Sequence, residues 1–190
     1  MRRTLSIEDM ARLLAAAEGD TLTLLELLYA SGARISEVVG LRWQDVDVLE
    51  RSARLRGKGN KERLVPLGKP CLRALELARN GHRGGDKVIG VSRQAAWARL
   101  RRLGRRLGID LSPHDIRAAM ARHLSDNGAD VICIRDLLGH ESVRTTNIYL
   151  EVAEENLHEK LALIRDSLAA VRGRRDTRRL RRTIGGLRLQ

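Results

Sequence analysis

The fold is decided first by one stretch of sequence, Ser112-Pro113-His114-Asp115-Ile116-Arg117. A serine followed by a proline and then by an acidic residue is a helix N-terminus. The serine hydroxyl can accept from the backbone N–H of Asp115, and the proline suits the first helical turn, where a backbone N–H has no helical partner. We therefore predict a helix from Pro113 to about Asp126.

Helices are also predicted on both sides of this stretch. Toward the C-terminus, Asp130 and Ser142 are predicted caps, and a long helix is expected over about 153–172. Ser92 is predicted to begin a helix with an apolar stripe of Ala96, Leu100, Leu103 and Leu107. Four helices are predicted earlier in the chain. The first runs from a Ser6 capping box to about Glu18, and the second follows Asp20 and ends near Gly32. The third runs from a Ser36 cap to Leu41, and the fourth begins at Lys69-Pro70.

Residues 52–67 have a different character. Two short strand-like segments flank the sequence Gly57-Lys58-Gly59-Asn60-Lys61. A Gly-Asn turn between such segments predicts a β-hairpin, with Lys58 at its tip or just before it. The expected fold class is therefore mainly α with one small antiparallel β-sheet.

The charge of the chain indicates a polyanionic partner. The formal net charge is +12, and the pI is about 11.0. Residues 172–190 hold eight arginines and one aspartate, a local +7, so more than half of the excess lies at one end. Aromatic residues make up only 2% and Phe is absent, which argues against modules that stack nucleic-acid bases on aromatic platforms.

The remaining composition indicates a cytoplasmic protein. Cys71 and Cys133 lie far apart with no zinc-ligand pattern nearby, so we interpret them as reduced thiols. No apolar stretch approaches the ~20 residues needed to cross a bilayer, and the first residues lack the apolar core of a signal peptide. We expect a soluble, nucleoid-associated protein without a metal, a cofactor or a membrane partner.

Five motifs, in order, resemble those of the tyrosine recombinase (phage integrase) family, most of all its Xer-type members. They are Gly32-Ala33-Arg34-Ile35-Ser36-Glu37, Gly57-Lys58-Gly59-Asn60-Lys61-Glu62-Arg63, His114-Asp115-Ile116-Arg117, Leu138-Gly139-His140 and Thr145-Thr146-Asn147-Ile148-Tyr149. The similarity covers about residues 5–160. The spacings also fit the family: 24 residues from Arg34 to Lys58, 23 from Arg117 to His140, and 9 from His140 to Tyr149. One such motif alone is weak, whereas the ordered set is specific.

The resemblance implies a nucleophile and two proton-transfer groups. The phenol of Tyr149 would attack a DNA phosphate in line, giving a 3′-phosphotyrosyl link and a free 5′-hydroxyl without ATP. Lys58 would protonate the departing 5′-oxygen, although Lys61 competes for this role. His114 would relay the proton of the phenol, whose ordinary pKa near ~10 hinders its loss at neutral pH.

The resemblance also implies three phosphate ligands. Arg34 and Arg117 would each hold non-bridging oxygens in a bidentate geometry that lysine cannot reproduce, and His140 would donate a hydrogen bond to the phosphate. His123 also matches a family position, but we interpret it as a packing residue. The row formed by Arg99, Arg102 and Arg106 fits phosphate contacts and an ordinary solvated face equally well.

The expected function is cleavage and exchange of DNA strands at a specific site. The alternatives are relaxation of supercoils, as by a type IB topoisomerase, and a non-catalytic DNA-binding regulator. Implied partners are double-stranded DNA, further copies of the chain in a tetramer on that DNA, and an accessory protein or second recombinase. Type IB relaxation needs no partner site, and a regulator needs no tyrosine at that spacing.

The predicted organisation is a catalytic domain over 1–172 and a basic tail over 173–190, whose order the composition leaves open. Most relatives carry an N-terminal helical DNA-clamping domain that the chain lacks, so it is either a fragment or a compact single-domain recombinase. Ala118, Ala119 and Met120 replace the His, small and aromatic residues usual in the family, which implies altered packing.

Overall fold

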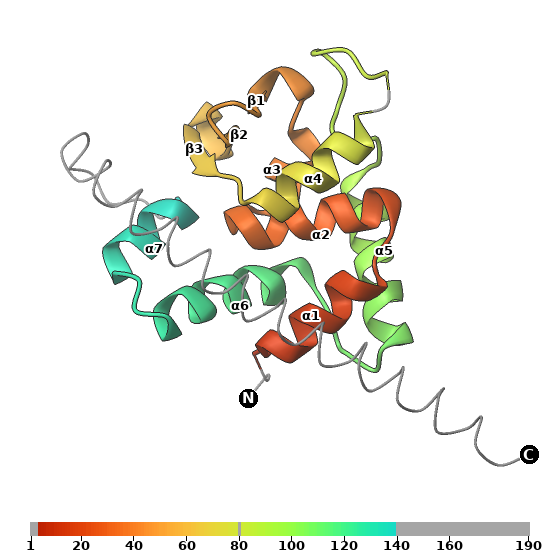
Figure 1. The fold of residues 1–190 in the computed structure, drawn as a ribbon, viewed down its shortest axis with the longest axis vertical. Coiled ribbons are helices and arrows are strands. Elements are labelled where there is room, and N and C mark those ends of the chain that lie inside the picture. The colour runs from red at the N-terminus through yellow and green to blue at the C-terminus, as the bar shows by residue number, and fades with distance from the viewer. Residues whose placement is uncertain (1–3, 80, 140–190) are drawn as a thin grey trace, which may run out of the picture.

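The computed structural model describes residues 4–79 and 81–139. In chain order its elements are α1 (Ile7–Ala16), α2 (Gly19–Ser31), α3 (Ile35–Gly40), the 3-10 turn η1 (Trp43–Asp45), β1 (Val46–Asp47), β2 (Ser52–Arg56), the 3-10 turn η2 (Lys58–Asn60), β3 (Glu62–Pro66), α4 (Lys69–Ala78), α5 (Arg93–Arg106), α6 (Pro113–Asp126) and α7 (Val131–Leu138) (Figure 1). This confirms the predicted fold of helices with one small antiparallel sheet. The predicted Ser142 cap and the helix over 153–172 lie outside the described residues.

Four of the predicted helix caps are confirmed. Each capping side chain accepts a hydrogen bond from a backbone N–H in the first turn: Ser6 from Asp9 at 3.1 Å, Ser92 from Ala95 at 3.2 Å, Ser112 from Asp115 at 3.3 Å and Asp130 from Ile132 at 2.6 Å. These bonds satisfy amides that have no partner within the helix. At Ser112 both hydrogen bonds of a capping box are present, because the Asp115 carboxylate also accepts from the Ser112 backbone N–H at 2.9 Å. The start of α6 is therefore built by local hydrogen bonds.

The start of α3 differs from the prediction. Ser36 lies inside the helix, and Arg34 precedes it in an extended conformation. The Glu37 carboxylate accepts a hydrogen bond from the backbone N–H of Arg34 at 2.8 Å, so the acidic residue closes this helix end. The prediction of a Ser36 cap was wrong because the helix begins one residue earlier, at Ile35, where Glu37 in the first turn accepts from the backbone N–H of the preceding Arg34.

The hairpin forms where it was predicted. β2 and β3 pair antiparallel, with Leu55 opposite Arg63, and β1 adds a short third strand at the other edge of β2. Gly59 and Asn60 have φ of 73° and 58°, in the left-handed region that glycine and asparagine tolerate. Lys58 begins the turn that joins the two strands.

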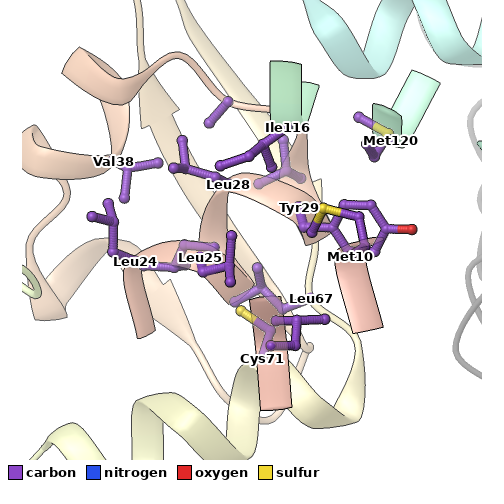
Figure 2. Packing of buried hydrophobic residues seen from close by; sticks show 14 of the residues in the cluster. Met10, Leu24, Leu25, Leu28, Tyr29, Val38, Leu67, Cys71, Ile116 and Met120 are labelled. Atoms are coloured by element: carbon purple, nitrogen blue, oxygen red, sulfur yellow. The ribbon is translucent and has the colours of Figure 1, made fainter. Parts of the chain in front are cut away.

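The core surrounds α2, which crosses the middle of the molecule and packs against α4, α5 and α6 (Figure 1). Four leucines of α2, Leu24, Leu25, Leu27 and Leu28, are at most 1% exposed. Figure 2 shows their neighbours from α1, α3, α4 and α6, which are almost all aliphatic or sulfur-containing. A helix that is apolar on every side must be enclosed, so the other helices are arranged around α2.

Candidate functional site

Arg117 is the buried arginine that ties three helices together. It lies in α6 and is 8% exposed. Its Nη1 donates to the carbonyl of Gly32, which caps the C-terminus of α2, and its Nη2 donates to the carbonyl of Leu138, the last residue of α7, at 2.7 Å. The last carbonyls of a helix have no helical partner, so a guanidinium can satisfy two helix ends at once. In Figure 1 these ends lie near the sheet, on one side of the molecule.

Gly32 is required at this junction. Its φ is 58°, and a Cβ there would lie 2.0 Å from Cε of Met120 and 2.8 Å from Cδ2 of Leu138. Any side chain would displace the core under α6 and α7. Met120, one of the departures from the family pattern, therefore packs against Gly32, the residue whose carbonyl accepts from Arg117.

A buried carboxylate organises the second part of the site. The side chain of Glu37 is 2% exposed, and it accepts two hydrogen bonds from Arg63, at 2.9 and 2.8 Å. It also accepts from Nη1 of Arg34 at 3.3 Å. The side chain of Arg34 is 50% exposed, whereas that of Arg63 is only 16% exposed. Arg34 thus presents its guanidinium to solvent while its backbone is held by Glu37.

The charges of these residues act on one another. Burial opposes ionisation of Glu37, but hydrogen bonds from Arg63 and the Arg34 backbone, with the charges of both arginines, hold the pKa of the carboxyl below its usual value. The pKa of Arg117 is lowered to about 10, first by burial and then by the charges of Arg34 and Arg63, against an opposing effect of Glu37. Arg117 stays protonated at neutral pH. The guanidiniums of Arg34 and Arg63 contact the Glu37 carboxylate, and that of Arg117 is near enough to interact with its charge, so positive charge is in excess among these four groups.

The predicted site residues divide into three groups. Arg34 and Arg117, 83 positions apart in the sequence, are brought close enough for their charges to interact. His114 is exposed in the first turn of α6, one turn before Arg117. The backbone of Lys58 lies at the start of η2, but its side chain is outside the description, as are His140 and Tyr149. The roles of all six remain predictions.

The sequence interpretation missed Glu37 and Arg63, although both lie within the quoted motifs. Two signals could have found them. An acidic residue three positions after Arg34 has capping-box spacing. Arg63 lies two residues before the buried Val65 in a strand, so both point to the same, inner face, and an inward arginine needs an anion.

The open question about the arginine row of α5 is partly resolved. Arg99 forms an ion pair with Asp20 at 2.8 Å, and Nη2 of Arg106 donates to the carbonyl of Ala16. These two arginines connect α5 to α2 and to the end of α1. Neither the prediction of phosphate contacts nor that of a solvated face anticipated this. Arg102 is exposed.

The packing role of His123 is confirmed. It is 4% exposed, its Nδ1 lies 2.8 Å from the Tyr29 hydroxyl, and its Nε2 lies 3.0 Å from the carbonyl of Leu5. With a neutral ring, both contacts are used when Nε2–H donates to the carbonyl of Leu5 and the Tyr29 hydroxyl donates to Nδ1.

Neither a metal-ligand cluster nor a membrane-spanning helix occurs in the described part of the chain. No group of three or more His, Cys, Asp or Glu side chains within residues 4–79 and 81–139 could hold a metal ion. Over the same residues, none of the helices combines the length and apolarity needed to cross a bilayer.

Known proteins resemble this chain in both fold and sequence. A family model described as the phage integrase family matches residues 3–156. Tyrosine recombinase XerD of Mycobacterium tuberculosis is 44% identical over 187 residues, covering 83% of this chain and 59% of the relative. Among solved structures, the integrase of mycobacterium phage Brujita has a TM-score of 0.70 at 25% identity, covering 84% of this chain and 57% of that one. The XerA recombinase has a TM-score of 0.66 at 32% identity, covering 86% and 65%.

The fold is that of a tyrosine recombinase catalytic domain, as the sequence predicted. The chain belongs to the phage integrase family. It spans about 59% of the length of the XerD relative it matches. The relative and the solved structures named above are a recombinase of this family, an integrase and a second recombinase.

Proposed function

We propose that the chain cleaves and rejoins duplex DNA at a specific site through a 3′-phosphotyrosyl link to Tyr149. The observation that carries this proposal is that Arg34, which contacts the buried Glu37 carboxylate, lies close enough to Arg117 for their charges to interact. One carboxylate stands against three guanidiniums here, so repulsion between like charges persists and a further anion would reduce it. A DNA phosphate would supply that negative charge, with oxygens that accept hydrogen bonds.

The two arginines would stabilise the charge that develops on the phosphate. Arg34 is half-exposed and can turn its guanidinium toward a phosphate, while Arg117 is held rigidly by two backbone carbonyls. Donors that are fixed before the reaction need no reorganisation in the transition state, which is where electrostatic catalysis gains most. His140 would add a further hydrogen bond to a phosphate oxygen.

The cleavage step needs two proton transfers. The Tyr149 oxygen bonds to phosphorus, and its proton passes to His114 or, through it, to water. The bond from phosphorus to the 5′-oxygen breaks, and Lys58 supplies the proton that the 5′-hydroxyl requires. Attack by a 5′-hydroxyl on the phosphotyrosyl link reverses both transfers and rejoins the strand, so the bond energy is conserved.

The catalytic unit would comprise residues 1–172, followed by a basic tail over 173–190. Strand exchange joins two cleaved duplexes, so we propose that copies of the chain assemble as a tetramer on DNA. An accessory protein or a second recombinase remains part of this proposal.

The test is capture of the covalent intermediate. A library of nicked duplexes, in which the cleaved end diffuses away, is incubated with the wild-type chain and with Tyr149→Phe. We expect DNA attached to wild-type protein after denaturing electrophoresis and none attached to the variant, because only the hydroxyl can form the link. DNA binding by the variant should stay near that of wild type. An adduct of wild-type yield in Tyr149→Phe would refute the proposal.

A further inference from the structure

Glu37 supports the hairpin on both sides of Lys58. Before Lys58, a Cβ placed on Gly57 would lie 3.2 Å from Oε1 of Glu37, so the backbone runs directly against this oxygen. After it, Arg63 donates to both oxygens of Glu37. A hydrogen bond of 2.8 Å from the N–H of Gly57 to the carbonyl of Lys61 closes the turn between these contacts. The loop that carries Lys58 is therefore held at its base by one carboxylate.

Arg63 extends this connection to α7. Its Nε donates to the carbonyl of Leu137 at 3.1 Å, and a Cβ on Gly139 would lie 3.2 Å from its Cδ and Nη1. The guanidinium thus fills the space between β3, α3 and the residue before His140. Planar guanidinium geometry allows two parallel bonds to a carboxylate and a third bond from Nε, which a lysine cannot match.

The arginines of strand β2 are more exposed than Arg63. Arg56 donates to Glu62 at 2.9 Å and to Asp45 at 3.2 Å, with a side chain that is 47% exposed. Arg54 pairs with Glu62 at 3.5 Å, and its side chain is 55% exposed. Exposed pairs of this kind contribute little because water screens them and side-chain entropy opposes them. Arg63 is distinguished by its burial, by a bidentate partner and by contacts with two other elements.

We propose that Arg63 is a positioning residue, which fixes the hairpin so that Lys58 meets the departing 5′-oxygen of the phosphate held by Arg34 and Arg117. The inference rests on the proposed cleavage reaction. Glu37 also holds the backbone of Arg34. The Glu37 carboxylate therefore helps to position both Arg34, a phosphate ligand, and the hairpin that carries Lys58, the proton donor. Arg63 connects the carboxylate to that hairpin.

A change of leaving group tests this role. In DNA with a bridging 5′-sulfur, the thiolate departs without a proton, so a defect in proton donation disappears while a defect in folding or phosphate binding persists. Lys58→Ala should lose most of its cleavage rate on ordinary DNA, where a general acid contributes ~10²–10⁴-fold, and recover on the sulfur substrate. Arg117→Ala should be slow on both.

The deciding variant is Arg63→Lys, which keeps a positive charge beside Glu37 and so avoids a buried unpaired carboxylate. We expect its adduct formation on ordinary DNA to fall by about tenfold or more, a part of the full general-acid contribution, and to return near wild type on the sulfur substrate. Arg63→Gln should show a larger loss with the same selectivity. The matched control is Arg54→Lys, on the same hairpin, whose ratio of the two rates should equal that of wild type.

Several results would overturn the proposal. Equal loss on both substrates would mean that Arg63 acts through folding or through Arg34. An unchanged rate in Arg63→Lys would mean that its geometry is irrelevant. Rescue of Lys61→Ala in place of Lys58→Ala would move the acid and overturn the proposal as stated. If wild-type protein forms no adduct with either substrate, the proposed function itself fails, and this outcome is distinct from the others.

Discussion

At residue 32 the chain passes through the left-handed region, and the carbonyl of this residue accepts a hydrogen bond from Arg117. Gly32 therefore adopts a backbone conformation that favours glycine, packs closely against the core, and accepts a hydrogen bond from a candidate phosphate ligand. A substitution there tests how much the backbone conformation and the close packing at Gly32 contribute to stability.

Gly32→Ala should lower the free energy of unfolding by about 2–5 kcal/mol. Left-handed backbone costs an alanine about 1–2 kcal/mol, and overpacking against Met120 and Leu138 adds about 1–3 kcal/mol. The measurement is chemical denaturation. Gly19→Ala is the matched control, because Gly19 has a φ of 51° but no atom within 4 Å of its Cβ position. Equal losses in the two variants would show that the contacts around Gly32 relax without cost.

At the scale of elements, α6 is fastened at both ends by different means. Its N-terminus is closed by the local capping box of Ser112 and Asp115. Near its C-terminus, His123 joins it to Tyr29 of α2 and to Leu5 before α1. The helix that carries His114 and Arg117 is thus coupled to the beginning of the described chain.

This coupling makes stability depend on pH. Burial lowers the pKa of His123 in the folded state, with smaller effects of the Leu5 carbonyl and nearby charges. Below pH ~6.5 the unfolded state then binds a proton that the folded state does not, so the free energy of unfolding falls as pH decreases. We expect a loss of up to about 1 kcal/mol from this group between pH 7.5 and 5.5.

Denaturation of wild-type protein and of His123→Gln at both pH values measures this contribution. The glutamine has no titrating group, so the difference between the two pH values should shrink by the amount that His123 supplies. An undiminished difference in the variant would assign the pH dependence to other groups. The variant should be less stable than wild type at pH 7.5, because the contacts with Tyr29 and Leu5 change.

At the scale of the whole molecule, charge is distributed unevenly. Residues 172–190 contribute +7 of the total +12. We expect a chain ending at Val171 to bind any DNA more weakly and with a shallower salt dependence, because each phosphate contact contributes about 0.9 to the slope of log affinity against log salt. Sequence preference should persist, because contacts to phosphate carry little sequence information.

Fluorescence anisotropy over a salt series, with a cleaved site and a scrambled duplex, measures both properties. A full-length chain in which the eight arginines of residues 172–190 are replaced by glutamine separates the effect of charge from that of length, and it should behave like the truncated chain. An unchanged slope in the truncated chain would show that the tail does not contact DNA, and would favour docking onto a neighbouring protomer.

Local patterns in the sequence determined the helices and the hairpin. Ser6, Ser92, Ser112 and Asp130 cap helices because each side chain reaches an amide within three residues, and Gly59-Asn60 turns the hairpin because both residues tolerate the left-handed region. The ordered motifs determined the family in the same way. None of these features depends on how the elements pack.

The partners of the charged side chains follow from the tertiary structure and not from local sequence. Glu37 and Arg63 are 26 residues apart, Arg117 and Gly32 are 85 apart, and Arg99 and Asp20 are 79 apart. A charged residue has the same appearance in the sequence whether it ends in solvent or beside a buried partner. Packing of the other helices around α2 removes water from some of these groups, and the cost of that desolvation selects their partners.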